Sequence, residues 1–581
     1  MNRKKSLASA AAIVLAASLA ACGGSSGGGD QEDRKDMDYG EAASSFEQVP
    51  DATGPAPEVE GAVTGGTITY EVPLDQGPED IDPTNGWSVL GNSILQDLVH
   101  RSLTQYRRNA ETGNMELVPD LATDLGTSND DFTEWTFTLR DGVRWETGDP
   151  VTAEEIKYGL ERSMDIETFT GGPGYAYSAG WFDCGEGYSG PQDGDCPGIT
   201  VDGRTITIKM VKPFSEFPWY STFMAMGPIP EKDSEFPAYG RAPLATGPYK
   251  VESFRPGESL VLVKNDQWDP ATDPARHQYA DKWVINFDAD QEKTDQLLLS
   301  GSGGTTISNR VGSTNVAEMQ AALGSNFLQQ PGGCVSYRSP DYTKITDINV
   351  RKAIAYAYDW ENVLIAQGEV PGVTRVPASS IMPPGMAGRR EVLVDGEQIA
   401  YDPEKARSLL EEAGQVGFKL TYIYDDSQPE YKAANDQEMK GYIAAGFEVE
   451  AIPYQEDEYD LYQDADSPIN KKLNLRKSGW CYDWPSGSTM IPPLYKTGQP
   501  YNTAFFSEKE IDDRMEEIGT LPIEEQADAW GALDEQILTE YFPSWPTAYR
   551  NDLFAAGSDI GGFSGNAAMS AISFKDLYVI E

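Results

Sequence analysis

The sequence predicts an α/β fold that carries an inserted α+β domain, and two observations support this prediction. Between residues 66 and 580, predicted strands alternate with predicted helices along the chain. The strands have an apolar residue at every second position, and the helices have apolar residues at helical spacing. Such an order favours parallel strands with helices on the faces of the sheet. From about residue 110 to 235, short strands, turns and Gly-rich loops replace this order and indicate a separate unit.

The elements before the inserted unit follow directly from residue type. Residues 66–70 alternate as a strand, and residues 82–88 are rich in turn formers. Apolar residues then fall on one face of a helix over residues 89–98, and residues 103–106 form a second strand.

The inserted unit has its own strand and helix signals. Residues 135–140 alternate with period two, and residues 205–210 do the same. Between them, Thr152 and Glu155 have the S/T-x-x-E spacing of a capping box, so we expect a helix to begin there.

The rest of the chain returns to alternating strands and helices. Asp402 followed by Pro403 predicts a helix start, because Asp caps free amides and Pro tolerates the first helical position. Strands are predicted at 246–251, 259–263, 418–424, 472–477 and 576–580, and helices at 291–299, 350–366, 511–518 and 523–541.

The N-terminus indicates export. Arg3, Lys4 and Lys5 precede an apolar stretch that is too short for a stable membrane span, so residues 1–21 are expected to be a signal peptide. The stretch ends in Leu-Ala-Ala-Cys22, which resembles the lipobox of bacterial lipoproteins and implies cleavage before Cys22 and a lipid on its thiol. An ordinary signal peptide with an incidental Cys is the alternative. Residues 22–63 are predicted to be a flexible tether.

The charge balance excludes several partners. The 581-residue chain has 45 Lys and Arg against 93 Asp and Glu, a net charge of −48. Nucleic acid requires a basic face, and anionic lipid attracts basic segments, so neither is expected to bind electrostatically. A strongly negative protein suits a soluble existence outside the cytoplasm.

Four cysteines remain once Cys22 is set aside. An even number in an exported chain indicates two disulfides, and the sequence alone permits three pairings. We favour Cys184 with Cys196, across a short loop, and Cys334 with Cys481. A zinc site is not expected, because the chain has only two histidines, far apart in sequence.

The stretch from Trp480 to Pro485 is the candidate binding site. It contains Trp480, Cys481, Tyr482, Asp483 and Trp484, directly after a predicted strand. A carboxylate among aromatic rings is unfavourable unless a cation pairs with it, and aromatic faces also attract ammonium groups. The stretch therefore predicts a pocket for an amino group. An aspartate that caps a turn, beside aromatics of the core, remains the alternative.

Several segments together resemble the extracytoplasmic solute-binding proteins of ABC importers, in the peptide/nickel/opine family. They are residues 135–145 with 152–156, residues 245–249 with 264–265, residues 350–354 with 358–359, and residues 402–414. The resemblance implies a two-lobed fold of the type II periplasmic-binding-protein kind with an additional domain. The implied division is lobe I at 64–109, 236–333 and 548–581, domain II at 110–235, and lobe II at 334–547.

The resemblance also assigns roles to single residues. In oligopeptide-binding members the Asp at the position of Asp483 pairs with the peptide amino group, and the Cys at the position of Cys481 is in a disulfide. Lys477 falls where some members carry a basic residue that faces the peptide carboxylate. Trp484 departs from the Tyr that is more common there. Further contacts are expected from Asn85, Ser88 and Asn502.

The sequence thus predicts a lipid-anchored, monomeric receptor that captures peptides between two lobes and delivers them to a membrane permease. The alternative is the same fold with another solute, such as an oligosaccharide, a nickel chelate or an opine. No cofactor is expected. An enzyme is not expected. The two histidines are isolated in the sequence and are unlike those of a catalytic triad, and the G-x-S-x-G matches lie in the tether, which cannot form a nucleophile elbow.

Overall fold

The computed structural model describes residues 47–73 and 77–580. The predicted signal peptide, the predicted lipidation site at Cys22 and the first part of the predicted tether lie outside the described residues. Within the described residues, no helix combines the length and the apolar character needed to cross a membrane.

A nine-stranded mixed sheet organises the fold, in the order β17-β13-β18-β12-β2-β11-β10-β9, with β14 also paired to β18. Only β2 has parallel neighbours, β11 and β12, and the other pairs are antiparallel. The prediction of parallel pairing is therefore correct at the centre of lobe I and wrong for the rest of this sheet, because hairpins and two long strands build the remainder. The bounds are β2 Thr67–Pro73, β9 Tyr249–Arg255, β10 Ser259–Lys264, β11 Lys282–Ala289, β12 Thr306–Ser308, β13 Phe327–Pro340, β14 Arg375–Pro377, β17 Leu475–Cys481 and β18 Trp545–Ala556.

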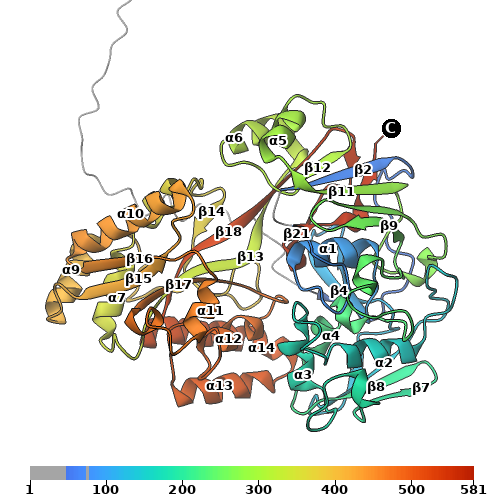
Figure 1. Ribbon diagram of the computed structural model, residues 1–581, viewed down its shortest axis with the longest axis horizontal. Helices are drawn as coiled ribbons and strands as arrows, with labels where there is room; N and C mark the ends of the chain where they lie inside the picture. The colour runs from blue at the N-terminus through green and yellow to red at the C-terminus, as the bar shows by residue number, and fades with distance from the viewer. Residues whose placement is uncertain (1–46, 74–76, 581) are drawn as a thin grey trace, which may run out of the picture. The chain divides into compact units, whose positions relative to one another are not determined.

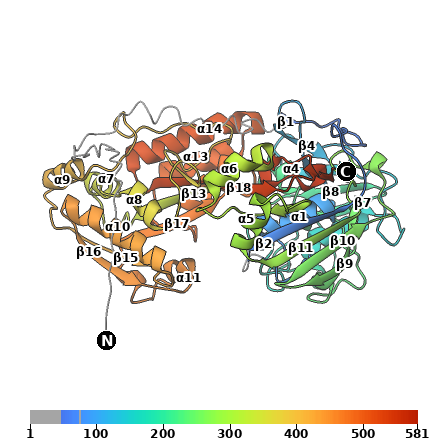
Figure 2. The same ribbon diagram turned by 90° about the horizontal axis from the view of Figure 1, so that it is seen from above.

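The two long strands β13 and β18 run from one lobe into the other (Figures 1 and 2). Their mutual register shifts between Pro331 and Val335, and again between Ser336 and Tyr337. The first half of β13 lies beside the half of β18 that also pairs with β12, and the second half lies beside β17. The expected lobe boundaries, 333/334 and 547/548, fall inside these two strands.

Lobe I packs helices against its part of the sheet. The helices are α1 (Val89–Leu98), α5 (Gln291–Leu299) and α6 (Val316–Leu323), and α1 begins and ends as the apolar pattern predicts. Ile94, Leu95 and Leu98 of α1 lie in one core cluster with the strand residues Tyr70 and Trp283. Short C-terminal strands complete this part: β19 Ile560–Gly561, β20 Gly565–Asn566, β21 Ala571–Ile572 and β22 Tyr578–Val579.

The inserted domain contains a four-stranded antiparallel sheet in the order β5-β6-β8-β7. The predicted capping box is confirmed: the Thr152 hydroxyl accepts the Glu155 amide and the Glu155 side chain accepts the Thr152 amide, at the start of α2. The Cys184–Cys196 disulfide is also confirmed. The bounds are β5 Thr127–Ser128, β6 Glu134–Thr138, β7 Ile199–Asp202, β8 Thr205–Lys209, α2 Ala153–Arg162, α3 Ser178–Trp181 and α4 Phe217–Tyr220.

Two expected limits differ from the structure. Strand β3 (Thr104–Arg108) pairs with β4 (Met115–Pro119), so the expected boundary at residue 110 cuts a hairpin. The tether was expected to extend to residue 63, but β1 (Glu47–Gln48) pairs with β4, and Ala52 and Ala56 are buried. The acidic, Pro-containing composition of residues 47–63 concealed these small apolar contacts.

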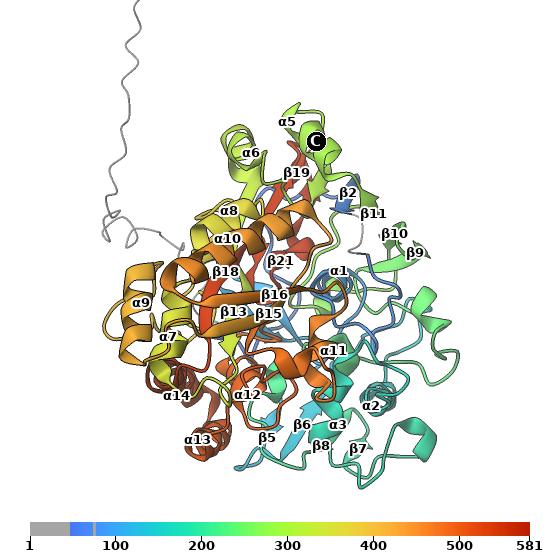
Figure 3. The same cartoon turned by 60° about the vertical axis from the view of Figure 1, so that its left-hand side comes forward.

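Lobe II surrounds a two-stranded parallel sheet with helices (Figure 3). The predicted start of α9 at Asp402 and Pro403 is confirmed. The single helix expected at 350–366 is wrong, because the Asp359 side chain accepts the Asn362 amide and caps a new helix. The bounds are β15 Lys419–Tyr424, β16 Glu448–Pro453, α7 Ile348–Tyr356, α8 Trp360–Ala366, α9 Pro403–Glu412, α10 Pro429–Ala445, α11 Glu458–Gln463, α12 Ile491–Tyr495, α13 Lys509–Gly519 and α14 Ile523–Gln536.

Candidate functional site

The loop that carries Asp483 leaves the sheet at a fixed point. Strand β17 ends at Cys481, two residues before Asp483, as the sequence predicts for a carboxylate just past a strand end. Cys481 lies opposite Cys334 of β13, and the predicted disulfide joins the two residues. The start of the loop is therefore tied to the strand that runs between the lobes.

The carboxylate of Asp483 is held by two neutral donors from distant parts of the chain. The indole Nε1 of Trp87, just before α1, donates to Oδ1 at 2.9 Å. The hydroxyl of Tyr177, from the inserted domain, donates to Oδ2. No lysine or arginine among the described residues forms an ion pair with Asp483.

This environment changes the acidity of the group. Burial raises the pKa of Asp483 to about 6, and the hydrogen bonds from Tyr177 and Trp87 oppose that rise only in part. At neutral pH the carboxylate is thus ionised, half-buried and without a compensating positive charge. Such a group favours the arrival of a ligand cation, which would make charge-assisted hydrogen bonds with it.

A cavity of about 180 Å³ opens beside Asp483. One of its walls is α1, where Asn92 is 5% exposed and its Oδ1 has no hydrogen-bond partner among the described residues. Asp483 and Asn92 thus both line this small space, and Asp483 supplies its carboxylate. The lining residues are Trp87, Val89, Asn92, Gln96, Thr222, Phe223, Cys481, Tyr482, Asp483, Ala568, Met569 and Ser570.

The aromatic walls differ from those predicted. Tyr482 lines the cavity, and its hydroxyl donates to the Ala567 carbonyl at 2.6 Å. Trp480 instead donates to the Thr489 carbonyl at 2.7 Å, and its ring lies 4.7 Å from that of Tyr501. Trp484 is buried at 2% exposure and does not line the cavity.

Three of the predicted contacts are not brought to Asp483, because local structure uses their hydrogen-bonding groups. The Ser88 hydroxyl accepts the Gly91 amide and caps α1. The amide of Asn85 donates to Asp80 and accepts from the Gly171 backbone. Asn502 is 4% exposed and makes its contacts with backbone atoms of residues 495, 496 and 506. Their role as ligand contacts stays a prediction.

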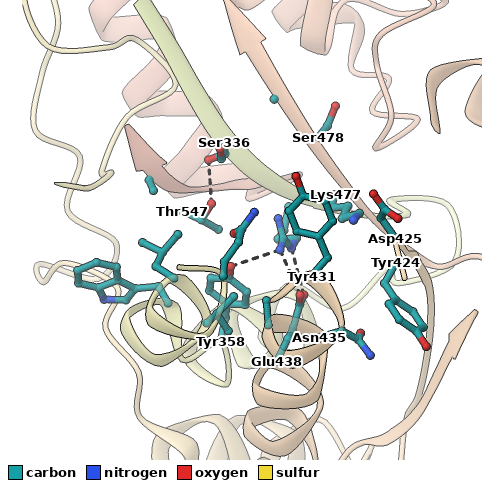
Figure 4. A pocket seen from close by; sticks show the side chains of 18 of the residues that line it. Ser336, Tyr358, Tyr424, Asp425, Tyr431, Asn435, Glu438, Lys477, Ser478 and Thr547 are labelled. Carbon is teal, nitrogen blue, oxygen red and sulfur yellow. Dashed lines mark hydrogen bonds and ion pairs between the residues drawn. The ribbon is translucent and has the colours of Figure 1, made fainter. Parts of the chain in front are cut away.

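Lys477 lies in a second pocket, of about 370 Å³, in lobe II. In the view of Figure 4, its side chain lies between Tyr431 and Asp425. Its ammonium forms no ion pair with any described carboxylate, whereas Arg338 in the same pocket is paired with Glu438. The pocket therefore contains a cation that is available to a ligand.

A third cavity, of about 560 Å³, joins these two pockets. It shares Val89 and Ser570 with the Asp483 cavity, and it shares Gln367, Arg375 and Tyr431 with the Lys477 pocket. The three spaces therefore adjoin one another, with the Asp483 carboxylate at one end and the Lys477 ammonium, which also attracts Glu458 of the same pocket, at the other.

A metal site and a catalytic triad built on histidine were also considered from the sequence. Among residues 47–73 and 77–580, no cluster of three or more His, Cys, Asp or Glu side chains has an arrangement that could hold a metal ion. His277 stacks on Tyr279 in lobe I, and His100 is buried beside Arg276, so neither histidine lies at the chain of cavities.

Comparison with known proteins gives consistent matches over most of the chain. The family model of bacterial extracellular solute-binding proteins, family 5, matches residues 116–502. The oligopeptide-binding protein OppA of Bacillus subtilis (strain 168) is 24% identical over 440 residues, which cover 72% of this chain and 76% of the relative. The periplasmic oligopeptide-binding protein OppA of Salmonella typhimurium is 23% identical over 475 residues, covering 78% of this chain and 83% of the relative.

The fold has solved counterparts. The structure of clavulanic acid biosynthesis oligopeptide binding protein 2 superposes with a TM-score of 0.79 at 22% identity, covering 92% of this chain and 99% of that protein. This likeness confirms the predicted two-lobed α/β fold. The family and the relatives are binding proteins and not enzymes.

Proposed function

Because the chain belongs to the bacterial extracellular solute-binding proteins of family 5, we propose that it captures peptides between its lobes and delivers them to an ABC permease. The observation that carries the proposal is the Asp483 carboxylate, half-buried and unmatched by any described cation. The peptide α-amino group would supply the missing positive charge. The two relatives described above are oligopeptide-binding proteins by name, which supports the same ligand class.

Asp483 would form the charge-assisted contact with the amino group. Trp87 and Tyr177 would keep the carboxylate oriented through their existing hydrogen bonds. A neutral sugar would leave the Asp483 charge uncompensated, which argues against an oligosaccharide.

The opposite end would receive the peptide carboxylate. Lys477 precedes Asp483 by six residues, which would span about 20 Å if fully extended and span less here, because β17 ends at Cys481. An extended peptide advances by about 3.3–3.6 Å per residue, so a peptide of about four to six residues would reach both charges. The available ammonium of Lys477 supports this direction of binding. The intervening cavity leaves room for the side chains between the two ends.

The N-terminal features complete the proposal. A lipid on Cys22 would hold the receptor at the outer face of the cytoplasmic membrane, and the segment after it would let the lobes reach a permease. A ligand enclosed between the lobes would favour the closed form that the permease accepts. We propose that the receptor acts as a monomer.

The experiment is a calorimetric comparison of four forms of one pentapeptide: free, N-acetylated, C-amidated, and blocked at both ends. We expect N-acetylation to weaken binding by about 30-fold or more, because it removes the cation that Asp483 needs. Equal affinity for the free and N-acetylated peptides would refute the amino-group contact. Binding of maltopentaose or a nickel–histidine complex in preference to every peptide would favour the alternative solutes.

A further inference from the structure

Trp484, at which the chain departs from the pattern more common in this motif, has a partner in the inserted domain. Its indole Nε1 donates to Oε2 of Glu216 at 2.9 Å. The hydroxyls of Ser486 and Ser488 donate to Oε1 and Oε2 of the same carboxylate. Glu216 thus receives three hydrogen bonds, all from one five-residue segment that begins directly after Asp483.

The Glu216 carboxylate is deeply buried. The residue is 4% exposed, and it forms no ion pair with any described lysine or arginine. Burial raises the pKa of the carboxyl, while the bonds from Ser486, Ser488 and Trp484 lower it. A buried charge is tolerated only when hydrogen bonds satisfy it. The donors of the loop therefore stabilise the Glu216 carboxylate, and the carboxylate in turn holds the loop in position.

The same domain holds the other side of Asp483. The ring of Tyr177 packs against Trp484 with centroids 4.8 Å apart, and the Tyr177 hydroxyl donates to Asp483. The aspartate is therefore fixed between a residue that bonds it directly and a neighbour that Glu216 anchors. Both anchors belong to the inserted domain, not to lobe II, from which the loop extends.

We infer that Glu216 is a positioning residue for ligand recognition, which holds the Asp483 carboxylate in place through Trp484, Ser486 and Ser488. The inference rests on the proposed function, since it presumes that Asp483 meets the ligand amino group. It also gives the inserted domain a role in selecting that group through a residue that does not itself line the cavity. Substitution of Glu216 should therefore reduce the preference for a free amino terminus more than it reduces binding as such.

Glu216→Gln is the direct test. It keeps the shape but removes the negative charge, so the hydrogen bonds from Trp484, Ser486 and Ser488 are no longer charge-assisted and hold the loop less firmly. The readout is the ratio of the affinities for a free and an N-acetylated pentapeptide, measured by calorimetry. We expect this ratio to fall by about tenfold or more, because the charge contact loses its alignment. The affinity for the N-acetylated peptide should change little.

Ser215→Ala is the matched control. The Ser215 hydroxyl accepts a hydrogen bond from Gln526 Nε2 at 2.6 Å, next to Glu216 in sequence and also between the inserted domain and lobe II. It makes no contact with the loop after Asp483 through that bond. A general loosening of the interface would affect this variant as well, whereas the positioning role predicts an unchanged ratio.

Trp484→Phe keeps the test decisive if Glu216→Gln does not fold. It removes the indole N–H donor together with part of the buried ring and retains one aromatic ring beside Tyr177, so the ratio should again fall. A wild-type ratio in a folded Glu216→Gln or Trp484→Phe variant would overturn the positioning role while leaving the peptide assignment intact. A wild-type protein without preference for the free amino terminus would overturn both.

Discussion

Replacement of Asp483 by Asn should stabilise the ligand-free protein and abolish tight binding. The pKa of the carboxyl is about 6 against an ordinary value of 3.8, because burial disfavours the ionised form. That difference of about 2.2, at 1.36 kcal/mol per pKa unit, corresponds to about 3 kcal/mol. Asn has nearly the same shape and can still accept from Trp87 and donate to Tyr177, so most of this penalty should disappear with the charge.

The sign follows from proton linkage. A carboxyl whose pKa is raised on folding binds a proton more tightly in the folded state, so its ionisation destabilises the fold above the folded pKa. At about pH 8 the Asn variant should thus have a free energy of unfolding up to about 3 kcal/mol higher than wild type, and at about pH 5 roughly half of that gain should remain. Urea denaturation of the ligand-free protein at both pH values measures the difference.

The same variant should lose affinity for a free pentapeptide by about 2–5 kcal/mol, which is about 30-fold to several-thousand-fold. Asp202→Asn is the control, because Asp202 lies exposed on β7, and both its stability and its peptide affinity should match wild type. A less stable Asp483→Asn protein at about pH 8, or a stability difference that does not change with pH, would refute the desolvation argument. Undiminished peptide affinity would refute the role of the charge.

Three further outcomes follow from the geometry. Peptide affinity should fall about tenfold between about pH 7.5 and about pH 5, because a carboxyl with a pKa of about 6 must ionise before it can pair with an ammonium, and an N-acetylated peptide should not show this change. The Lys477→Gln variant should bind a peptide with a free carboxyl end and the same peptide with an amidated end equally well. In a series of peptides of increasing length, the affinity of the wild-type protein should be highest at about four to six residues. Replacing both cysteines of the Cys334–Cys481 bridge by Ser should lower the free energy of unfolding by about 5 kcal/mol, against about 3 kcal/mol for the Cys184–Cys196 bridge, because the first closes a much longer loop; equal losses in urea denaturation would contradict the loop-entropy argument.

The sequence predicted those parts of the site that depend on local order. The position of Asp483 after a strand followed from alternation and from the Pro that ends the pairing. The even number of cysteines predicted two disulfides, and the bridge between Cys334 and Cys481 was the favoured one of three possible pairings. Local structure also explains why Ser88 and Asn502 are not brought to Asp483. Both are residue types that bond nearby backbone, and here a helix cap and a turn use that capacity.

The partners of Asp483 could not be predicted in the same way. Trp87 is 396 residues away in sequence and Tyr177 is 306 residues away, and nothing in either neighbourhood indicates a shared carboxylate. Asn92 did leave a signal, because it is polar within a helix whose other residues are mostly buried. A polar residue at a buried helical position predicts either a hydrogen bond in the core or a group that faces a cavity.

The pKa of Asp483 depends on the contact between the domains, because the residues that surround Asp483 come from different domains. The carboxylate comes from lobe II, Trp87 from lobe I, and Tyr177 from the inserted domain, so its desolvation requires all three. If the lobes separate, water reaches the carboxylate and its pKa must fall toward the ordinary value, because the burial that raises it is lost. Closing the lobes without a ligand is therefore unfavourable while Asp483 is ionised, because its charge is desolvated. Closing them around an ammonium is favourable, because the two charges then pair. The same charge that selects the ligand would then also make closing conditional on the ligand being there.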